Sequence, residues 1–159
     1  MVSSEKTPMP WLVIWARAKS LLILPFGECA CTVEPTASLA APSDLERWGA
    51  RVFSDVPEQA DLLLIGGRIS KKMPPVPQQT FERMLQPKWV VALGGCGCAA
   101  FDAPGQPPVQ ACGFYDTYSQ ARDVGRFVQA DPDAPGCPPG IEDLIDTNDD
   151  LQCKIRHKG

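Results

Sequence analysis

Four cysteines lie in loops rich in glycine or proline: Cys29, Cys31, Cys96 and Cys137. The loops that hold Cys29, Cys31 and Cys96 each follow an apolar run that is typical of a buried strand. In an open α/β sheet, the loops at the carboxyl ends of the strands gather along one edge, where ligands bind. Thiols that are far apart in the sequence would therefore meet at one point. Because four converging thiolates are the usual ligands of an iron–sulfur cluster, the sequence predicts such a centre at one edge of a sheet.

The spacing of the cysteines allows either Cys29 or Cys98 to be the fourth ligand of the cluster. Three ligands do not depend on that choice: Cys31, Cys96 and Cys137. Cys29 is the expected fourth, since both sulfurs of the Cys-x-Cys pair reach one cluster if the backbone folds back. Gly27 would ease that turn, because glycine adopts unusual backbone angles without strain. Cys98 would replace Cys29 if Cys29 could not reach the cluster.

Two other roles compete for the seven cysteines of the chain. The Cys-x-Cys pairs at 29/31 and 96/98 could bind zinc, although structural zinc sites usually use wider Cys-x(2–4)-Cys spacing. Free cysteine is also a common small buried hydrophobe. That role is expected for Cys112 and Cys153, because neither has a partner at motif spacing.

Composition narrows the class of protein. A formal net charge of −4 argues against nucleic acid as the partner. The cysteine count is odd and no secretory signal opens the chain, so the thiols are expected to be reduced and cytosolic. The apolar stretch from Trp11 to Phe26 contains Arg17 and Lys19, and is therefore too short and too charged to span a bilayer.

The chain is expected to form a single iron–sulfur domain over residues 11–157, preceded by a flexible arm over residues 1–10. Its most secure elements are two continuous apolar runs, over 61–67 and 88–94. A run without polar alternation indicates a strand buried on both faces. These runs therefore predict an α/β fold with a parallel sheet covered by helices.

Weaker patterns predict the remaining elements. Residues at helical spacing, including Met84 and Leu85, predict a helix over 76–86 that closes a βαβ unit. A capping pattern at Ser43 predicts a helix that Gly49 ends. The other expected elements are a helix over 11–20, strands over 21–24, 50–53 and 112–118, and a terminal helix over 141–155.

Acid–base catalysis has little support in the sequence. The single histidine, His157, lies in a charged tail and is expected to be solvated, as are the acidic residues at 142–150. No Gly-x-Gly-x-x-Gly turn follows any expected strand, so a flavin that accepts hydride would belong to another chain.

Motifs in a fixed order run along residues 11–157: Trp15-Ala16-Arg17, Phe26-Gly27, Cys31-Thr32-Val33-Glu34, Lys72-Met73, Pro87-Lys88-Trp89-Val90, Gly95-Cys96 and Gly136-Cys137-Pro138-Pro139. This set resembles the B subunit of NADH–quinone oxidoreductase, the respiratory complex I subunit that carries the terminal [4Fe–4S] cluster. The same superfamily includes the small subunits of [NiFe] hydrogenases.

The resemblance implies a flavodoxin-like, three-layer α/β fold that docks on a large partner subunit, together with other iron–sulfur subunits and a membrane arm. It implies that a [4Fe–4S] cluster passes single electrons to a quinone where the two subunits meet. The chain would then be one subunit of an NADH:quinone oxidoreductase, without a complete active site of its own. It would lie peripherally on the cytoplasmic side of the inner membrane.

By this resemblance, three cysteines carry over as cluster ligands: Cys31, Cys96 and Cys137. Met73 matches a position that lines the quinone cavity, with packing of the loop as the alternative role. Glu34 stays beside the ligand loop, where it would contribute to the quinone environment or to the partner interface.

The departures from the family pattern fall around the cluster and the quinone cavity. The family has two adjacent cysteines in the first ligand loop, whereas here Ala30 takes the first of those places and Cys29 stands one residue earlier. Two family methionines after the glutamate are replaced by Pro35 and Thr36. An altered acceptor or reduction potential is therefore a hypothesis, because potential depends on hydrogen bonds to sulfur and on solvent exposure.

Two further functions compete with electron transfer to a quinone. One is the small subunit of a membrane-bound, energy-converting [NiFe] hydrogenase, whose nickel ligands would lie on the large subunit. The other is a structural subunit that has lost its cluster, which the displacement of Cys29 suggests and which predicts a protein without iron.

Overall fold

The computed structural model describes residues 10–27, 45–52, 56–67, 69–95, 120–121, 124–134, 136 and 138–158. Most of the expected arm, the capping residue Ser43 and the strand expected over 112–118 lie outside these ranges. So do Glu34 and six of the seven cysteines, including all four expected ligands.

In the described part of the chain, five strands form the central sheet in the order β2-β1-β3-β5-β7, and every neighbouring pair is parallel. The strands are β1 (Leu21–Phe26), β2 (Ala50–Val52), β3 (Leu62–Gly66), β5 (Trp89–Leu93) and β7 (Asp133–Ala134). Counted along the chain, this order is 2-1-3-4-5, the flavodoxin-like arrangement. The expected α/β fold with a mainly parallel sheet is confirmed. A small antiparallel pair, β4 (Ile69–Ser70) and β6 (Gln120–Ala121), accompanies the sheet.

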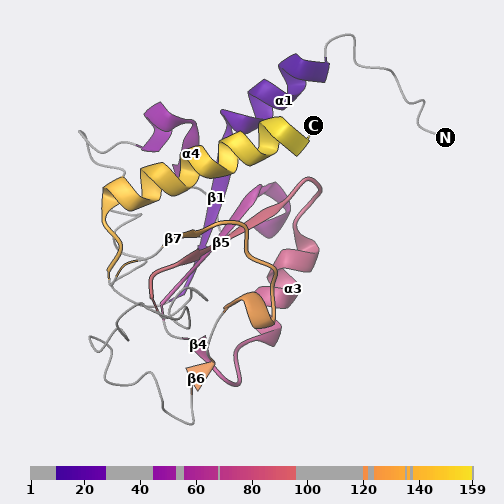
Figure 1. Ribbon diagram of the computed structural model, residues 1–159. Coiled ribbons are helices and arrows are strands. Elements are labelled where there is room, and N and C mark those ends of the chain that lie inside the picture. The colour runs from indigo at the N-terminus through magenta and orange to yellow at the C-terminus, as the bar shows by residue number, and fades with distance from the viewer. Residues whose placement is uncertain are drawn as a thin grey trace, which may run out of the picture.

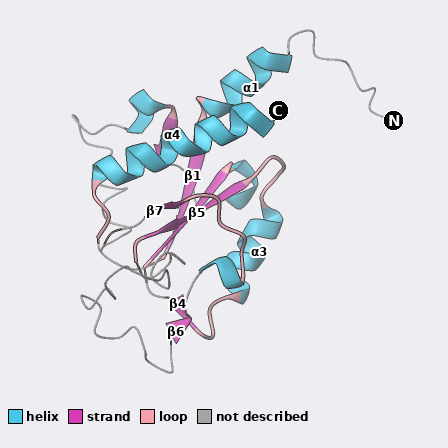
Figure 2. Ribbon diagram, in the orientation of Figure 1, coloured by secondary structure: helices cyan, strands magenta, loops and turns pink. Residues whose placement is uncertain are grey.

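Helices cover both faces of the sheet and give the molecule three layers (Figures 1 and 2). The α-helices are α1 (Pro10–Ala18), α3 (Pro75–Arg83) and α4 (Ile141–Lys158). Single 3-10 turns are η1 (Leu45–Trp48), η2 (Pro57–Gln59) and η4 (Val124–Arg126). α1 and α4 contact each other and lie on one face of the sheet, whereas α3 lies on the other. In the part of the chain that the structure describes, no helix is long and apolar enough to cross a membrane.

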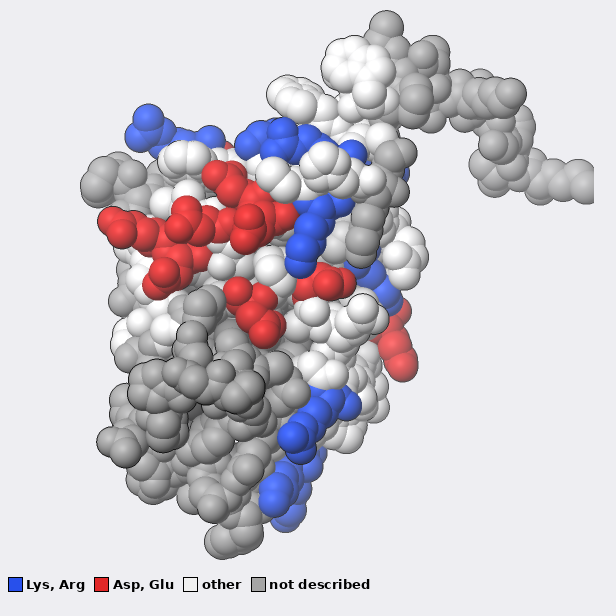
Figure 3. All heavy atoms as spheres, in the orientation of Figure 1, with Lys and Arg blue, Asp and Glu red and all other residues white. Residues whose placement is uncertain are grey.

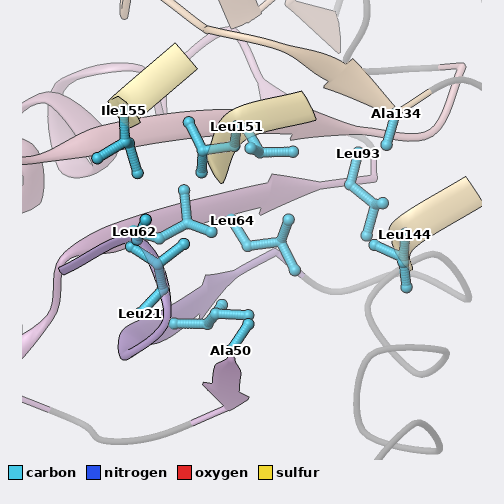
Figure 4. Close-up of a cluster of buried hydrophobic side chains, with 12 residues drawn as sticks. Leu21, Ala50, Leu62, Leu64, Leu93, Ala134, Leu144, Leu151 and Ile155 are labelled. Carbon is cyan, nitrogen blue, oxygen red and sulfur yellow. The ribbon is translucent and has the colours of Figure 1, made fainter. Parts of the chain in front are cut away.

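The two faces of the sheet carry separate hydrophobic clusters. β3 is buried at every residue, as its continuous apolar run predicts. Leu62 and Leu64 lie in the cluster under α4, where they join Leu151 (Figure 4). Leu63 and Ile65 alternate to the other face and join the cluster under α3. Burial of each such leucine contributes roughly 2–3 kcal/mol relative to an exposed one.

Two details differ from expectation. α3 ends at Arg83, and Met84 adopts an extended conformation in which its side chain is buried while that of Leu85 is exposed. Side chains along an extended chain alternate in direction at each residue, so only one of these two side chains faces the core.

The expectation that Cys153 is a buried hydrophobe is wrong, because this thiol is exposed. It lies two residues after the buried Leu151, which is about 200° around a helix.

The expected helix after Ser43 is a single 3-10 turn, η1, and Gly49 ends it with a φ of 82°. Asn148 and Gln152 of α4 both donate side-chain hydrogen bonds to the carbonyl of Trp48. These bonds fix η1 against α4.

Charge is distributed unevenly along α4. Exposed acidic residues lie in its first ten positions, where Figure 3 shows acidic side chains gathered over the helix. They are Glu142, Asp143, Asp146 and Asp150. Its last half contains Lys154, Arg156 and His157, all exposed. This order complements the helix dipole, which favours anions at the amino end and cations at the carboxyl end. The expectation of a solvated acidic face and a solvated His157 is confirmed.

Candidate metal centre

The carboxyl ends of the strands are aligned along one edge of the sheet. The register pairs Phe26 of β1 with Ile65 of β3, Ile65 with Ala92 of β5, and Ala92 with Asp133 of β7. Because all these strands are parallel, the segments that follow β1, β5 and β7 leave the sheet on the same side. Those segments contain the four expected ligands, which lie outside the described residues.

The segments that lead to Cys96 and Cys137 are joined by backbone hydrogen bonds. The N–H of Gly94 donates to the carbonyl of Ala134 at 2.8 Å, and the N–H of Gly95 donates to the carbonyl of Gly136 at 2.7 Å. Gly95 and Gly136 each stand one residue before an expected ligand. The described backbone is therefore held together one residue before each of these two cysteines.

β1 ends two strand positions away from β5, with β3 between them. Two interstrand spacings amount to about 10 Å. An extended chain covers up to about 3.5 Å per residue, so a segment leaving Gly27 toward β5 reaches that distance within about three residues. Cys29 and Cys31 are two and four residues beyond Gly27. The chain length therefore allows this loop to approach the other two segments.

β1 and β3 also form the switch point of the sheet. From β1 the chain continues to β2 on one side, and β3 then pairs with β1 on the other side. At such a point the loops diverge and leave a crevice at the carboxyl edge, which is where open α/β folds bind ligands. The topology thus indicates the same edge as the cysteine pattern.

Four of the described glycines at this edge have positive φ angles, which side chains disfavour: Gly27, Gly67, Gly94 and Gly136. Gly27 has a φ of 128°, in agreement with the turn expected after β1. Gly136 also has a φ of 128°, and a Cβ there would lie 2.5 Å from the Cα of Pro139. The buried Pro139 therefore lies close to the backbone of Gly136, three residues earlier. Sequence reasoning missed the role of Gly136, although the Gly-Cys-Pro-Pro sequence was a signal for it.

Met73 lies close to the same edge along the chain, in the turn between β4 and α3. Its N–H donates to the carbonyl of Ser70 at 2.8 Å, and its carbonyl accepts a bond from the N–H of Val76 at 2.9 Å. Its side chain is 42% exposed.

The described residues contain no group of three His, Cys, Asp or Glu side chains that could hold a metal ion. A metal centre at this edge therefore depends on the cysteines that follow the strands.

Asp61 stands at the opposite edge and has a structural role. Its carboxylate accepts a hydrogen bond from the N–H of Leu22 at 3.1 Å, and its backbone bonds to Leu22 and Trp89. Burial raises the pKa of Asp61 above the ordinary 3.8, partly offset by the Leu22 hydrogen bond and by Arg17. The ionised carboxylate is therefore disfavoured in the folded protein.

Asp61→Asn is expected to become more stable relative to wild type as the pH rises. The raised pKa means that the folded state binds more protons than the unfolded state above pH 3.8, so the stability contributed by this group falls through that window. Asparagine keeps an oxygen for the Leu22 N–H without the charge. Urea unfolding of both proteins between about pH 3.5 and 7.5 checks this. A stability difference that does not change with pH would contradict it.

This chain is similar to known proteins both in sequence and in structure. The family described as NADH ubiquinone oxidoreductase, 20 Kd subunit, matches residues 29–151. The B subunit of the NADH-quinone oxidoreductase of Protochlamydia amoebophila is 39% identical over 158 residues, which cover 96% of this chain and 89% of that protein. NADH-quinone oxidoreductase subunit 6 of Thermus thermophilus is 38% identical over 150 residues, which cover 94% and 76%.

The structural likeness extends to another complex. A chain in the structure of the membrane-bound sulfane sulfur reductase, an archaeal respiratory membrane complex, superimposes with a TM-score of 0.75 at 29% identity. The match covers 93% of this chain and 77% of that one.

Proposed function

Since the chain belongs to the family of the 20 kDa subunit of NADH–ubiquinone oxidoreductase, we propose that it is the electron-transfer subunit of a complex I-type oxidoreductase. In this proposal it holds a [4Fe–4S] cluster and passes electrons to a quinone at the interface with a large partner subunit. Other iron–sulfur subunits and a membrane arm complete the complex. The chain lies peripherally on the cytoplasmic side of the inner membrane.

The observation that carries the proposal is the hydrogen bond from Gly95 to Gly136. It brings together two segments that are 41 positions apart in the sequence (136 minus 95), each one residue before a cysteine. The donor set fits the group, because thiolates that converge from separate loops suit a cubane cluster. The proposed ligands are Cys29, Cys31, Cys96 and Cys137.

The residues of this chain would hold the cluster and control its surroundings. When bound, the cluster supplies one-electron transfer, which is chemistry that the protein itself lacks. Ile65 and Leu93 are fully buried near the ends of β3 and β5, so water is excluded from the sheet at that edge. Exclusion of water and hydrogen bonds to sulfur are the means by which a protein tunes the potential of a cluster.

The quinone contact is proposed at the exposed turn after β4. Met73 offers a half-exposed, apolar and polarisable side chain there, between the exposed Lys72 and α3. A thioether of this kind suits packing against an apolar ring at a subunit interface. Glu34 is the second proposed residue near the quinone, on the basis of its place beside the ligand loop.

Iron and acid-labile sulfide should be present at about four atoms each for every copy of this chain in the anaerobically purified complex. Low-temperature EPR of the reduced complex should show a [4Fe–4S] signal, and comparison with isotope-labelled or mutant complexes should assign that signal to this chain. An assembled complex in which this chain holds no iron would overturn the electron-transfer proposal and leave the structural alternative.

A related complex with another acceptor is the second candidate. The likeness to a chain of a sulfane sulfur reductase complex favours it, together with the substitutions around the first ligand loop. A [NiFe] hydrogenase belongs to this candidate class. Identities of 38–40% to quinone oxidoreductase subunits, against 29% to the reductase chain, favour the first proposal. Paired Cys-x-x-Cys motifs in the neighbouring large subunit would identify a hydrogenase.

A further inference from the structure

The junction between α4 and η1 contains two buried acceptors. Asn148 and Gln152 both donate amide N–H groups to the carbonyl of Trp48, at 3.1 Å from Nδ2 of Asn148. Their own amide oxygens, Oδ1 of Asn148 and Oε1 of Gln152, accept no hydrogen bond from the described part of the chain. The two residues are only 6% and 0% exposed. Because an unpaired buried polar atom costs free energy, native proteins rarely leave one without a donor.

Rotation of the Asn148 amide does not supply the donor. Exchange of its two ends would turn Oδ1 toward the carbonyl oxygen of Trp48, and neither oxygen carries a hydrogen. The bond from Nδ2 to Trp48 therefore fixes which end of the amide faces η1. The donor for Oδ1 must come from a group other than this pair.

A small cavity lies beside Asn148, between α4, η1 and the sheet. Its walls come from β1, β3, β5, η1 and α4, and four of its leucines are labelled in Figure 4: Leu62, Leu64, Leu144 and Leu151. Among the described residues that line it, only Thr147 and Asn148 are polar. The centre of a water molecule has about 20 Å³ in which to lie. Since a bound water needs about 10–15 Å³ by this measure, there is room for one.

Thr147 provides a second polar partner in the cavity wall. Its hydroxyl donates to the carbonyl of Asp143 at 2.6 Å, one turn earlier on α4. The hydroxyl proton is thereby used, and Oγ1 keeps lone pairs that can accept a hydrogen bond. Two neighbouring residues of the wall, Thr147 and Asn148, thus each carry an acceptor that one donor molecule could serve.

We propose that this cavity binds one water molecule, which donates hydrogen bonds to Oδ1 of Asn148 and Oγ1 of Thr147. Two to four polar partners are typical of buried waters, whereas a wholly apolar cavity stays empty. The water holds the Asn148 amide in the orientation in which its N–H reaches Trp48. It thereby supports the attachment of η1 to α4, where the described chain resumes after the segment that contains Cys29 and Cys31. The proposal does not depend on the cluster or on the electron acceptor.

A density map of the purified complex that resolves ordered waters tests the site directly. A peak is expected at about 2.6–3.2 Å from both Oδ1 of Asn148 and Oγ1 of Thr147. The peak should disappear in the map of Thr147→Val, because valine has nearly the shape of threonine without the hydroxyl. Absence of the peak from the wild-type map would overturn the proposal, as would a peak that persists unchanged in the variant.

The stability of the full chain gives a second readout. Thr147→Val is expected to raise the equilibrium constant for urea unfolding about fivefold or more, since it removes an acceptor of the water together with the bond to Asp143. Thr80→Val is the matched control, because Thr80 donates the same kind of bond on α3, to the carbonyl of Val76 at 2.9 Å, in an exposed position. This control should raise the constant by less than about twofold.

A dry cavity predicts the opposite order of stability. Valine would then suit the apolar walls better than threonine, and Thr147→Val would be at least as stable as Thr80→Val. That result would overturn the proposal. Circular dichroism confirms that both variants are folded before unfolding is measured.

Discussion

Cys29→Ala is expected to remove or convert the [4Fe–4S] EPR signal of the reduced complex, whereas Cys98→Ala leaves the signal unchanged. A cubane cluster needs four thiolates, and loss of one leaves an iron without its protein ligand. Gly27, with its φ of 128°, turns the chain as it leaves β1, and Cys29 follows two residues later. Iron content and EPR spectra of the two anaerobically purified variants provide the measurement.

The pair of variants separates three assignments of the fourth ligand. Loss in Cys98→Ala with an intact signal in Cys29→Ala would transfer the role to Cys98. An intact signal in both variants would mean a ligand from outside this chain, and would contradict the assignment of Cys29. Cys153→Ala is a further control, because Cys153 is exposed on α4 and should have no effect.

Gly136→Ala is expected to destabilise the protein by about 2 kcal/mol or more. The φ of 128° is unfavourable for alanine, and its Cβ would lie 2.5 Å from the Cα of Pro139. Backbone cannot move aside as a flexible side chain does, so the backbone at Gly136, one residue before Cys137, must change. Urea unfolding gives the stability, and the iron content of the variant reports on the site.

Gly140→Ala provides a matched control four residues later. The nearest atom to a Cβ at Gly140 is Oδ2 of Asp143 at 3.4 Å, an ordinary contact. This substitution should change stability by less than about 0.5 kcal/mol and leave iron binding intact. Equal effects of the two substitutions would show that the turn at Gly136 has no special constraint.

The fold was predictable where the apolar pattern was continuous. β3 and β5 follow from runs without polar residues, and the same runs predicted burial on both faces and parallel pairing. The helical spacing after Pro139 likewise predicted α4. Spacing alone did not show that α3 ends at Arg83, nor that Leu85 is exposed, because a change to extended backbone reassigns which residues face the core.

The location of the site was predictable from the sequence, but the backbone pairing that joins its segments was not. Cysteines after strands pointed to the carboxyl edge, and the parallel sheet places those strand ends together. β7 was not foreseen, since two residues carry no pattern and their pairing with β5 spans about 40 positions of sequence. The hydrogen bond between Gly95 and Gly136 depends on that pairing.

Because β7 is so short, binding of the cofactor would also affect the stability of the sheet. Ala92↔Asp133 and Leu93↔Ala134 are the pairs that join β7 to β5, and two glycine N–H groups extend the contact. A cluster bound by both Cys96 and Cys137 would link the segments that follow β5 and β7. It would therefore hold β7, the most weakly attached strand described, to the rest of the sheet. Because metal binding to such a site adds to the free energy of folding, iron would hold the end of the sheet closed. Under iron shortage, the folded protein would then be less stable, and less of it would be available for assembly of the complex.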